Sequence, residues 1–201
     1  MKGICFIEPL FHKVVKGEKT QTRRIITNED WMNQSHIRIE LSDDNCFAHF
    51  ISNNSGEAFA GKVAKYAPHE KVYLKEPYYK DSSDDIHYKF GYPENQKEMD
   101  KHNLKWSNKL FMPESAARYF IEITEIRAER LQDISDEDCI KEGIGWSDFP
   151  AIHFGIKEGE YFHWLGDTPQ KAYAALIDKI NGKGTWEKNP FVWVYDFKLT
   201  Q

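Results

Sequence analysis

The order in which strand-like and helix-like segments follow one another constrains the fold of this chain most. A strand pattern is followed by a helix, several strands, two more helices and a final strand. The strand at 71–76 alternates cleanly, with Val72 and Leu74 on the side opposite Lys71, Tyr73 and Lys75. Antiparallel pairing dominates such an order, with the helices as satellites of the sheet. The sequence therefore predicts an α+β fold. The expected strands are 3–8, 20–26, 46–51, 58–66, 71–76, 119–128 and 191–199.

Three helices are expected from their start and stop signals. The first spans 10–16, where apolar residues fall on one face and a glycine follows. The second starts at Ser135, which is followed three positions later by an acid, as in a capping box. The third starts at Thr168 before a proline and ends at Gly182. These residue types predict where each helix begins or ends.

The length of the chain indicates one domain. Its 201 residues are enough to bury a substantial core. We expect a single domain over 1–201. The segment 81–108 is polar, with little pattern beyond 86–90, and is predicted to be an insertion into that domain. The segment 28–45 is also polar and is expected to be irregular.

The charge distribution points to a local site on an acidic protein. The formal net charge is −5, which argues against a protein that coats long nucleic acid with a basic surface. The charges are nevertheless segregated along the chain, which is a first indication of a functional site. Within 13–26, one acid accompanies five basic residues: Lys13, Lys16, Lys19, Arg23 and Arg24. Within 129–142, two basic residues accompany six acids: Glu129, Asp133, Asp136, Glu137, Asp138 and Glu142.

Cysteine and histidine spacing gives no indication of a metal site, a cofactor or a disulfide framework. Cys5, Cys46 and Cys139 are far apart and odd in number, which favours free thiols in a reducing compartment. The eight histidines are scattered without the spacing of ligand pairs. The N-terminus lacks the apolar run of a signal peptide, and no segment has the length of a membrane span. We therefore expect a cytoplasmic protein without metal, cofactor or membrane association.

The segment GEKTQTRR at 17–24 is the strongest candidate for a working site. Its glycine permits a tight reversal after the first helix, and the residues that follow are extended. Arginine forks bind phosphate and carboxylate groups in a bidentate manner, and lysine adds a point charge. Hydroxyl groups position ligands or act as nucleophiles when a base is near. On residue types alone, a solvated basic turn is an equally good interpretation.

This segment resembles the signature of the ASCH family, a branch of the PUA-like β-barrels. Further stretches are similar to ASCH-type proteins of phages and prophages, and together they span nearly the whole chain. At 69–70 the family usually has Gly-Asp where this chain has His-Glu, which suggests an altered turn. The similar stretches are HEKVYLKEPY at 69–78, MPESAAR at 112–118, RLQDIS at 130–135, EGI at 142–144, ING at 180–182, Trp186 and NPFVWV at 189–194.

The resemblance implies a small β-barrel with flanking helices and a basic cleft that holds RNA or a nucleotide-like ligand. It also implies an alternative, because a small class of bacterial ASCH enzymes hydrolyses the acyl amide of N4-acetylcytidine with a lysine, a threonine and a glutamate. The lysine and threonine of that pattern match Lys19 and Thr22, and the glutamate is matched more loosely by Glu142. A lysine beside a hydroxyl can take its proton, and a carboxylate can orient the pair. A third alternative is a phage accessory protein whose cleft binds a protein partner.

Simpler roles remain open for each of these residues. Lys19 can be a phosphate anchor, Thr22 a strand hydroxyl and Glu142 the end of a helix. Glu76 is expected to pair with Arg23 or Arg24 inside the cleft. Tyr73, Tyr78 and Trp106 are expected in the barrel wall, and Arg118 can serve the fold as easily as the ligand. The predicted ligand-binding residues are Thr20, Arg23, Arg24, Lys75 and Glu76. The sequence predicts neither the oligomeric state nor whether the chain is an enzyme.

Overall fold

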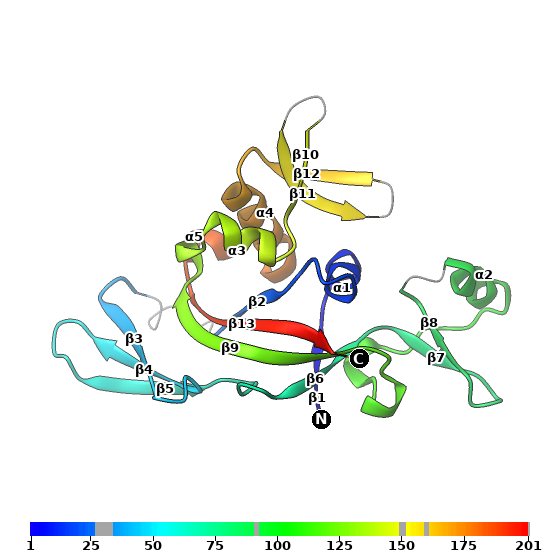
Figure 1. Ribbon diagram of the computed structural model, residues 1–201, viewed down its shortest axis with the longest axis horizontal. Helices are drawn as coiled ribbons and strands as arrows, with labels where there is room; N and C mark the ends of the chain where they lie inside the picture. The colour runs from blue at the N-terminus through cyan, green and yellow to red at the C-terminus, as the bar shows by residue number, and fades with distance from the viewer. Residues whose placement is uncertain (27–33, 91–92, 149–151, 159–160, 201) are drawn as a thin grey trace.

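The computed structural model describes residues 1–26, 34–90, 93–148, 152–158 and 161–200. The described chain is a mixed α+β structure built on a central sheet of five strands, with smaller sheets at its periphery (Figure 1). The two chain ends lie close together at the same end of this sheet (Figure 1). The order of strands across the central sheet is β1 (Lys2–Cys5), β6 (Lys71–Lys75), β9 (Phe120–Arg130), β13 (Phe191–Thr200) and β2 (Gln21–Ile25).

The pairing in this sheet is mostly antiparallel, as the sequence predicts. Strand β1 pairs in parallel with β6, and the other neighbours are antiparallel. Strands β9 and β13 form its long centre, with a register shift where Ile123 and Glu125 of β9 face consecutive residues of β13. This bulge interrupts the strict alternation expected for 119–128, because an extra residue changes which side chains face the core. Ile121, Ile123 and Ile126 are consequently all buried.

The central sheet is open in the described part of the chain, and the expected barrel does not close. The strands expected at 46–51 and 58–66 are β4 (Phe47–Ser52) and β5 (Ala58–Val63), which form a separate sheet with β3 (Ile37–Leu41). Phe50 stands edge-on to Phe191 at a ring distance of 5.7 Å. At the open edges, β1 and β2 are joined by a side chain, since Arg24 Nη2 donates to the carbonyl oxygen of Cys5 at 2.8 Å.

The expected helices form near their predicted ends and gather on one side of the central sheet (Figure 1). The hydroxyl of Ser135 accepts a hydrogen bond from the backbone of Asp138, and Thr168 caps the helix that follows it in the same way. Gly182 ends that helix with φ 105°. The helices are α1 (Glu8–Val15), α3 (Asp136–Lys141), α4 (Pro169–Asn181) and a short α5 (Thr185–Lys188).

Several elements were not anticipated from the sequence. The segment 81–108 contains β8 (Ile86–Tyr88), which pairs with β7 (Tyr78–Lys80), and α2 (Pro93–Lys101); together they project from one end of the molecule (Figure 1). Above α4 lies a sheet of β10 (Gly145–Ser147), β11 (His153–Glu158) and β12 (Tyr161–Gly166) (Figure 1). Part of the expected irregular segment 28–45 lies outside the described residues, and β3 lies within the rest of it. Short 3₁₀ turns lie at Lys109–Phe111, Glu114–Ala116 and Leu131–Asp133.

Candidate functional site

The turn after α1 directs the lysine of the motif into the protein. Gly17 has φ 73°, a backbone conformation that residues with a Cβ rarely adopt. The backbone amides of Glu18 and Lys19 both donate to the carbonyl of Lys13, and Thr20 donates to the carbonyl of Lys141 at the end of α3. The turn is therefore fixed between α1 and α3. Lys19 is only 1% exposed, so the solvated basic turn does not describe this residue.

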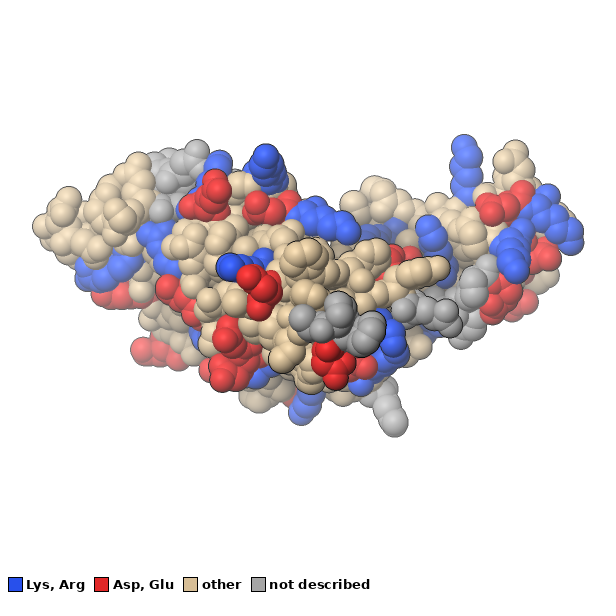
Figure 2. All heavy atoms as spheres, turned by 90° about the horizontal axis from the view of Figure 1, so that it is seen from above, with Lys and Arg blue, Asp and Glu red and all other residues tan. Residues whose placement is uncertain are grey.

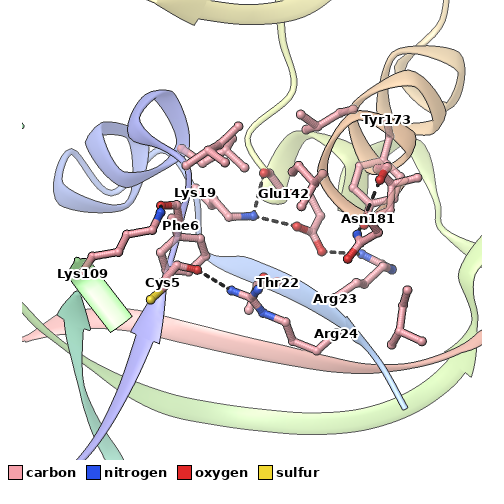
Figure 3. A pocket seen from close by; sticks show the side chains of 16 residues that line it. Cys5, Phe6, Lys19, Thr22, Arg23, Arg24, Lys109, Glu142, Tyr173 and Asn181 are labelled. Carbon is pink, nitrogen blue, oxygen red and sulfur yellow. Dashed lines mark hydrogen bonds and ion pairs between the residues drawn. The ribbon is translucent and has the colours of Figure 1, made fainter. Parts of the chain in front are cut away.

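Lys19 is held by Glu142, which ends α3 (Figure 3). Its Nζ lies 2.6 Å from Glu142 Oε2 and 2.7 Å from the backbone carbonyl oxygen of the same residue. A third bond, also 2.7 Å, reaches the carbonyl of Gln21. The three donors of the ammonium thus have three acceptors. The carbonyl at a helix C-terminus carries partial negative charge, which favours a cation at this position.

The surroundings lower the pKa of Lys19 from its usual value. Burial is the largest cause, because the charged ammonium loses its hydration. Glu142 opposes this effect, whereas Arg24 and Arg23 add to it by repulsion. The sequence left these competing effects unresolved, and in the structure burial outweighs the carboxylate.

The two arginines of the motif have different partners, although both line the cavity described below. Arg23 belongs to a buried ionic network, in which its Nη2 lies 2.8 Å from Asp138 Oδ2 and also contacts Glu129. Arg127 joins the same Asp138 carboxylate. The arrangement neutralises the acids of α3 and β9 inside the protein. It accounts for the segregated charges of the sequence as a fold-stabilising contact between the two segments.

Arg24 has no carboxylate partner in the described part of the chain. Its guanidinium donates to the carbonyl of Cys5 and lies 5.4 Å from the ring centre of Phe6. Lys109 is in the same situation, since its Nζ donates to the carbonyl of Phe6 at 2.8 Å. Neither cation is paired with a carboxylate of the described residues, and both line the same cavity (Figure 3).

This cavity, which we call the pocket, has a volume of about 220 Å³. Lys19, Thr22 and Glu142 line it together (Figure 3). The predicted catalytic trio therefore shares one pocket, although the three positions span more than half of the chain. Four basic residues line it against one carboxylate. The remaining lining is largely apolar and comes from β1 and the residues after it, from α1, from the end of β2 and from α4: Cys5, Phe6, Ile7, Leu10, Ile25, Leu176, Ile177 and Ile180, with Tyr173 and Asn181.

Tyr173 places a hydroxyl in the wall of the pocket. The residue is 2% exposed, and its hydroxyl has no hydrogen-bond partner among the described residues. Burial raises the pKa of this hydroxyl well above its usual value, with Glu142 adding to the effect, so it is protonated at neutral pH. A buried polar group without a partner is rare and calls for an explanation. The sequence places Tyr173 on the apolar face of a helix, which gave no sign of this role.

The other predicted ligand-binding residues lie elsewhere. Thr20 does not line the pocket, and its backbone amide holds the turn by donating to the carbonyl of Lys141. Lys75 lines a neighbouring cavity that also contains Arg24. Glu76 pairs with Arg118 instead of Arg23 or Arg24, with both carboxylate oxygens at 2.7 Å. That expectation was wrong because Glu76 follows β6, which β9 and β13 separate from β2 in the central sheet. Arg118, just before β9, is the nearer arginine.

The aromatic residues expected in the barrel wall lie outside the pocket, and two of them, Tyr78 and Trp106, lie in the projecting segment and not in a barrel wall. The hydroxyl of Tyr73 is buried and donates to the carbonyl of Met112 at 2.9 Å. The indole of Trp106 donates to Gln96 in the projecting segment that contains α2. Tyr78 belongs to β7. Lys109, which does line the pocket, was missed because it lies in a polar stretch without a recognisable motif.

The described residues contain no group of three His, Cys, Asp or Glu side chains that could hold a metal ion. No helix in this part of the chain is long and apolar enough to cross a membrane. The three cysteines are free, and Cys139 is buried while Cys5 and Cys46 are partly exposed.

Comparison of the chain with protein-family models, with curated proteins and with solved structures found no match in any of the three. The fold and the site therefore define a mixed α+β protein with a small, partly basic pocket.

Proposed function

We propose that this protein is an ASCH-type, PUA-like domain that binds RNA or a nucleotide-like ligand in the pocket. The observation that carries the proposal is the position of Arg24. It lines a cavity of polar and apolar side chains and has no carboxylate partner among the described residues. A guanidinium in this state is suited to an anionic or hydrogen-bonding ligand.

The dimensions of the pocket favour one nucleoside-sized group. Cavities that hold drug-sized ligands measure roughly 300–1,000 Å³. The pocket, at about 220 Å³, is smaller than these, so it suits a ligand no larger than a base or a single nucleoside. Leu176, Ile177 and Phe6 offer apolar surface to a ring, and Tyr173 and Glu142 offer polar groups to its edge. A nucleobase requires apolar surface against the faces of its ring and polar groups at its edge.

The surface charge is consistent with a short ligand. Seen from above, acidic and basic side chains are interspersed over the molecule, without one continuous basic field on this face (Figure 2). The net charge of −5 would repel a long polyanion outside the pocket. A nucleotide, or one unit of a short single strand, meets positive charge only locally.

A blocked pocket tests the proposal. Ile180 lines the pocket and is 40% exposed, so Ile180→Trp is expected to fill the entrance without disturbing the core. Calorimetric titration with cytidine, uridine, adenosine and guanosine should show binding of at least one to the wild type and none to this variant. The control is Ile152→Trp, at an exposed isoleucine that does not line the pocket. Equal binding by both variants, or no binding by the wild type, contradicts the proposal.

The second candidate is removal of the acyl group from an N4-acylated cytidine, and the contact between Lys19 and Glu142 favours it. A lysine serves as a base only when neutral, and burial moves the pKa of Lys19 in that direction. At 2.6 Å, Glu142 is placed to receive the lysine proton. Thr22 lines the same pocket and supplies a hydroxyl.

In this reaction the hydroxyl oxygen of Thr22 attacks the acyl carbon, and its proton passes to the neutral amine of Lys19. The bond from the acyl carbon to the cytidine nitrogen then breaks, and Glu142 returns a proton to that nitrogen. Water hydrolyses the resulting ester and releases a carboxylic acid. Alternatively, Thr22 positions a water that attacks directly. Arg24 lines the same pocket and would stabilise the negative oxygen that develops.

The hydrolase candidate is tested by incubating the purified protein with N4-acetylcytidine and measuring release of cytidine. Turnover should be lost in Thr22→Val, which keeps the shape of the side chain, and in Lys19→Met. Turnover that persists in both variants would place the chemistry elsewhere. Binding of the nucleoside by the wild type without turnover would reject the hydrolase and retain the binding function.

A further inference from the structure

A second cavity lies beside the pocket, and we call it the basic groove. It is the larger of the two, at about 550 Å³. Arg24, Lys65 and Lys75 line it, and the aromatic rings of Tyr66 and Tyr195 contribute to its walls. No carboxylate is found among the described residues that line it. The charged side chains that line the groove are therefore all positive, although the net charge of the protein is negative.

Arg24 joins the groove to the pocket. The two cavities share Cys5, Arg24 and Ile25 in their lining. The bond from Arg24 to the carbonyl of Cys5, at 2.8 Å, fixes the guanidinium at this shared boundary. Among the described residues only one of its nitrogens is engaged in a hydrogen bond, so the rest of the donor fork can face a ligand that spans both cavities.

The two lysines of the groove are not neutralised by carboxylates in the described part of the chain. Lys75 Nζ donates to the carbonyl of Leu110 at 2.7 Å and lies 5.5 Å from the ring centre of Tyr73. Lys65 is exposed, with its Nζ at 5.2 Å from the ring centre of Tyr66. Positive charges that converge in a concave surface raise the local concentration of anions, even on a protein of negative net charge.

We propose that the basic groove is a phosphate subsite for the ligand whose nucleoside occupies the pocket. This inference rests on the proposed function and narrows it to a phosphorylated ligand. Arg24 contacts the ligand where its nucleoside and phosphate meet, and Lys65 and Lys75 bind the phosphate oxygens. The chemistry is that of a phosphate ester, which a free mononucleotide and the backbone of a short single-stranded RNA both supply.

The test compares cytidine, cytidine 5′-monophosphate and the dinucleotide CpC as calorimetric probes of the full chain. A phosphate that accepts a charge-assisted bond should raise affinity by about tenfold or more over cytidine. A preference for CpC over the monophosphate identifies the diester as the source, and the reverse preference identifies the mononucleotide. The advantage of the phosphate should decrease between about 50 mM and 200 mM salt.

Lys65→Gln and Lys75→Gln should each remove most of that advantage while cytidine itself binds as before. The control is Lys157→Gln, at an exposed lysine of β11 that lines neither cavity, and it should change nothing. Equal affinity for cytidine and both phosphorylated probes overturns this inference and leaves the proposed function intact. Absence of binding by all three probes overturns this inference, and the proposed function falls with it when uridine, adenosine and guanosine do not bind either.

Discussion

Glu142 contacts Lys19 through its carboxylate and its backbone carbonyl at once, at 2.6 and 2.7 Å from the same ammonium nitrogen. The pair joins the turn after α1 to the end of α3, and both side chains are buried. The pair therefore stabilises the fold and also lines the pocket. Any experiment on the chemistry of Lys19 must separate these two contributions.

Replacement of Lys19 alone should destabilise the protein strongly. Lys19→Met leaves the buried carboxylate of Glu142 without its lysine, and the loss of one partner of a buried pair costs about 3–5 kcal/mol. The double variant Lys19→Met/Glu142→Met should recover much of this loss, because no uncompensated charge remains. Unfolding in urea at neutral pH measures both. A double variant no more stable than the single one would show that the pair does not carry the effect.

Arg23 and Arg24 should respond differently to the same substitution. Arg23→Ala removes the most buried partner of Asp138 and Glu129 and leaves them Arg127, so it should reduce the free energy of unfolding by about 3 kcal/mol, the lower end for a broken buried pair. Arg24→Ala removes one bond to a carbonyl and should cost only about 1 kcal/mol of stability. Its main effect should be on ligand affinity, by about 1–3 kcal/mol.

Urea unfolding and calorimetric titration on both variants check this separation. Loss of affinity in Arg23→Ala should appear only where the protein has begun to unfold. Equal effects of the two substitutions on stability would contradict the assignment of Arg23 to the fold and Arg24 to the ligand.

The sequence predicted the helix ends and most of the central strands because these depend on local chemistry. Ser135, Thr168 and Gly182 act within one turn of the chain, so their residue types suffice. The strands of the small sheet at 145–166 escaped prediction because glycines and exposed aromatics weaken their alternating pattern. Their identity depends on pairing with one another.

The candidate site was predictable only in part. The motif at 17–24 drew attention to Lys19, Thr22 and the arginines, and the resemblance to a family suggested Glu142. Which carboxylate meets which arginine depends on sheet order, and residue types alone could not distinguish Arg118 from Arg23 as the partner of Glu76. The roles of Tyr173 and Lys109 also follow from packing, because neither belongs to a motif.

Acidification should destabilise the protein through Asp138. Burial alone would raise the pKa of this carboxyl, but Arg23 and Arg127 hold it below its usual 3.8. The unfolded chain then binds a proton more readily than the native protein. The stabilisation is complete above about pH 4 and is lost as the pH falls through the lowered native pKa.

Asp138→Asn should therefore lower stability at neutral pH and make its loss in acid less steep. Urea unfolding between about pH 7 and pH 3 measures both effects. The control is Asp167→Asn, since that side chain is 63% exposed and its replacement should change stability by no more than about 0.5 kcal/mol. Parallel pH profiles for wild type and Asp138→Asn would rule out this role.

The last prediction concerns the hydroxyl of Tyr173. Tyr173→Phe removes a buried group that has no partner among the described residues, so the free energy of unfolding should stay the same or rise. If the hydroxyl bonds the ligand, affinity should fall by about 0.5–1.5 kcal/mol. The matched control is Tyr73→Phe, whose buried hydroxyl bonds the carbonyl of Met112 outside the pocket. That variant should lose about 1 kcal/mol of stability and keep its affinity. A Tyr173→Phe protein that is less stable yet binds normally would make the hydroxyl a structural group and remove it from the site.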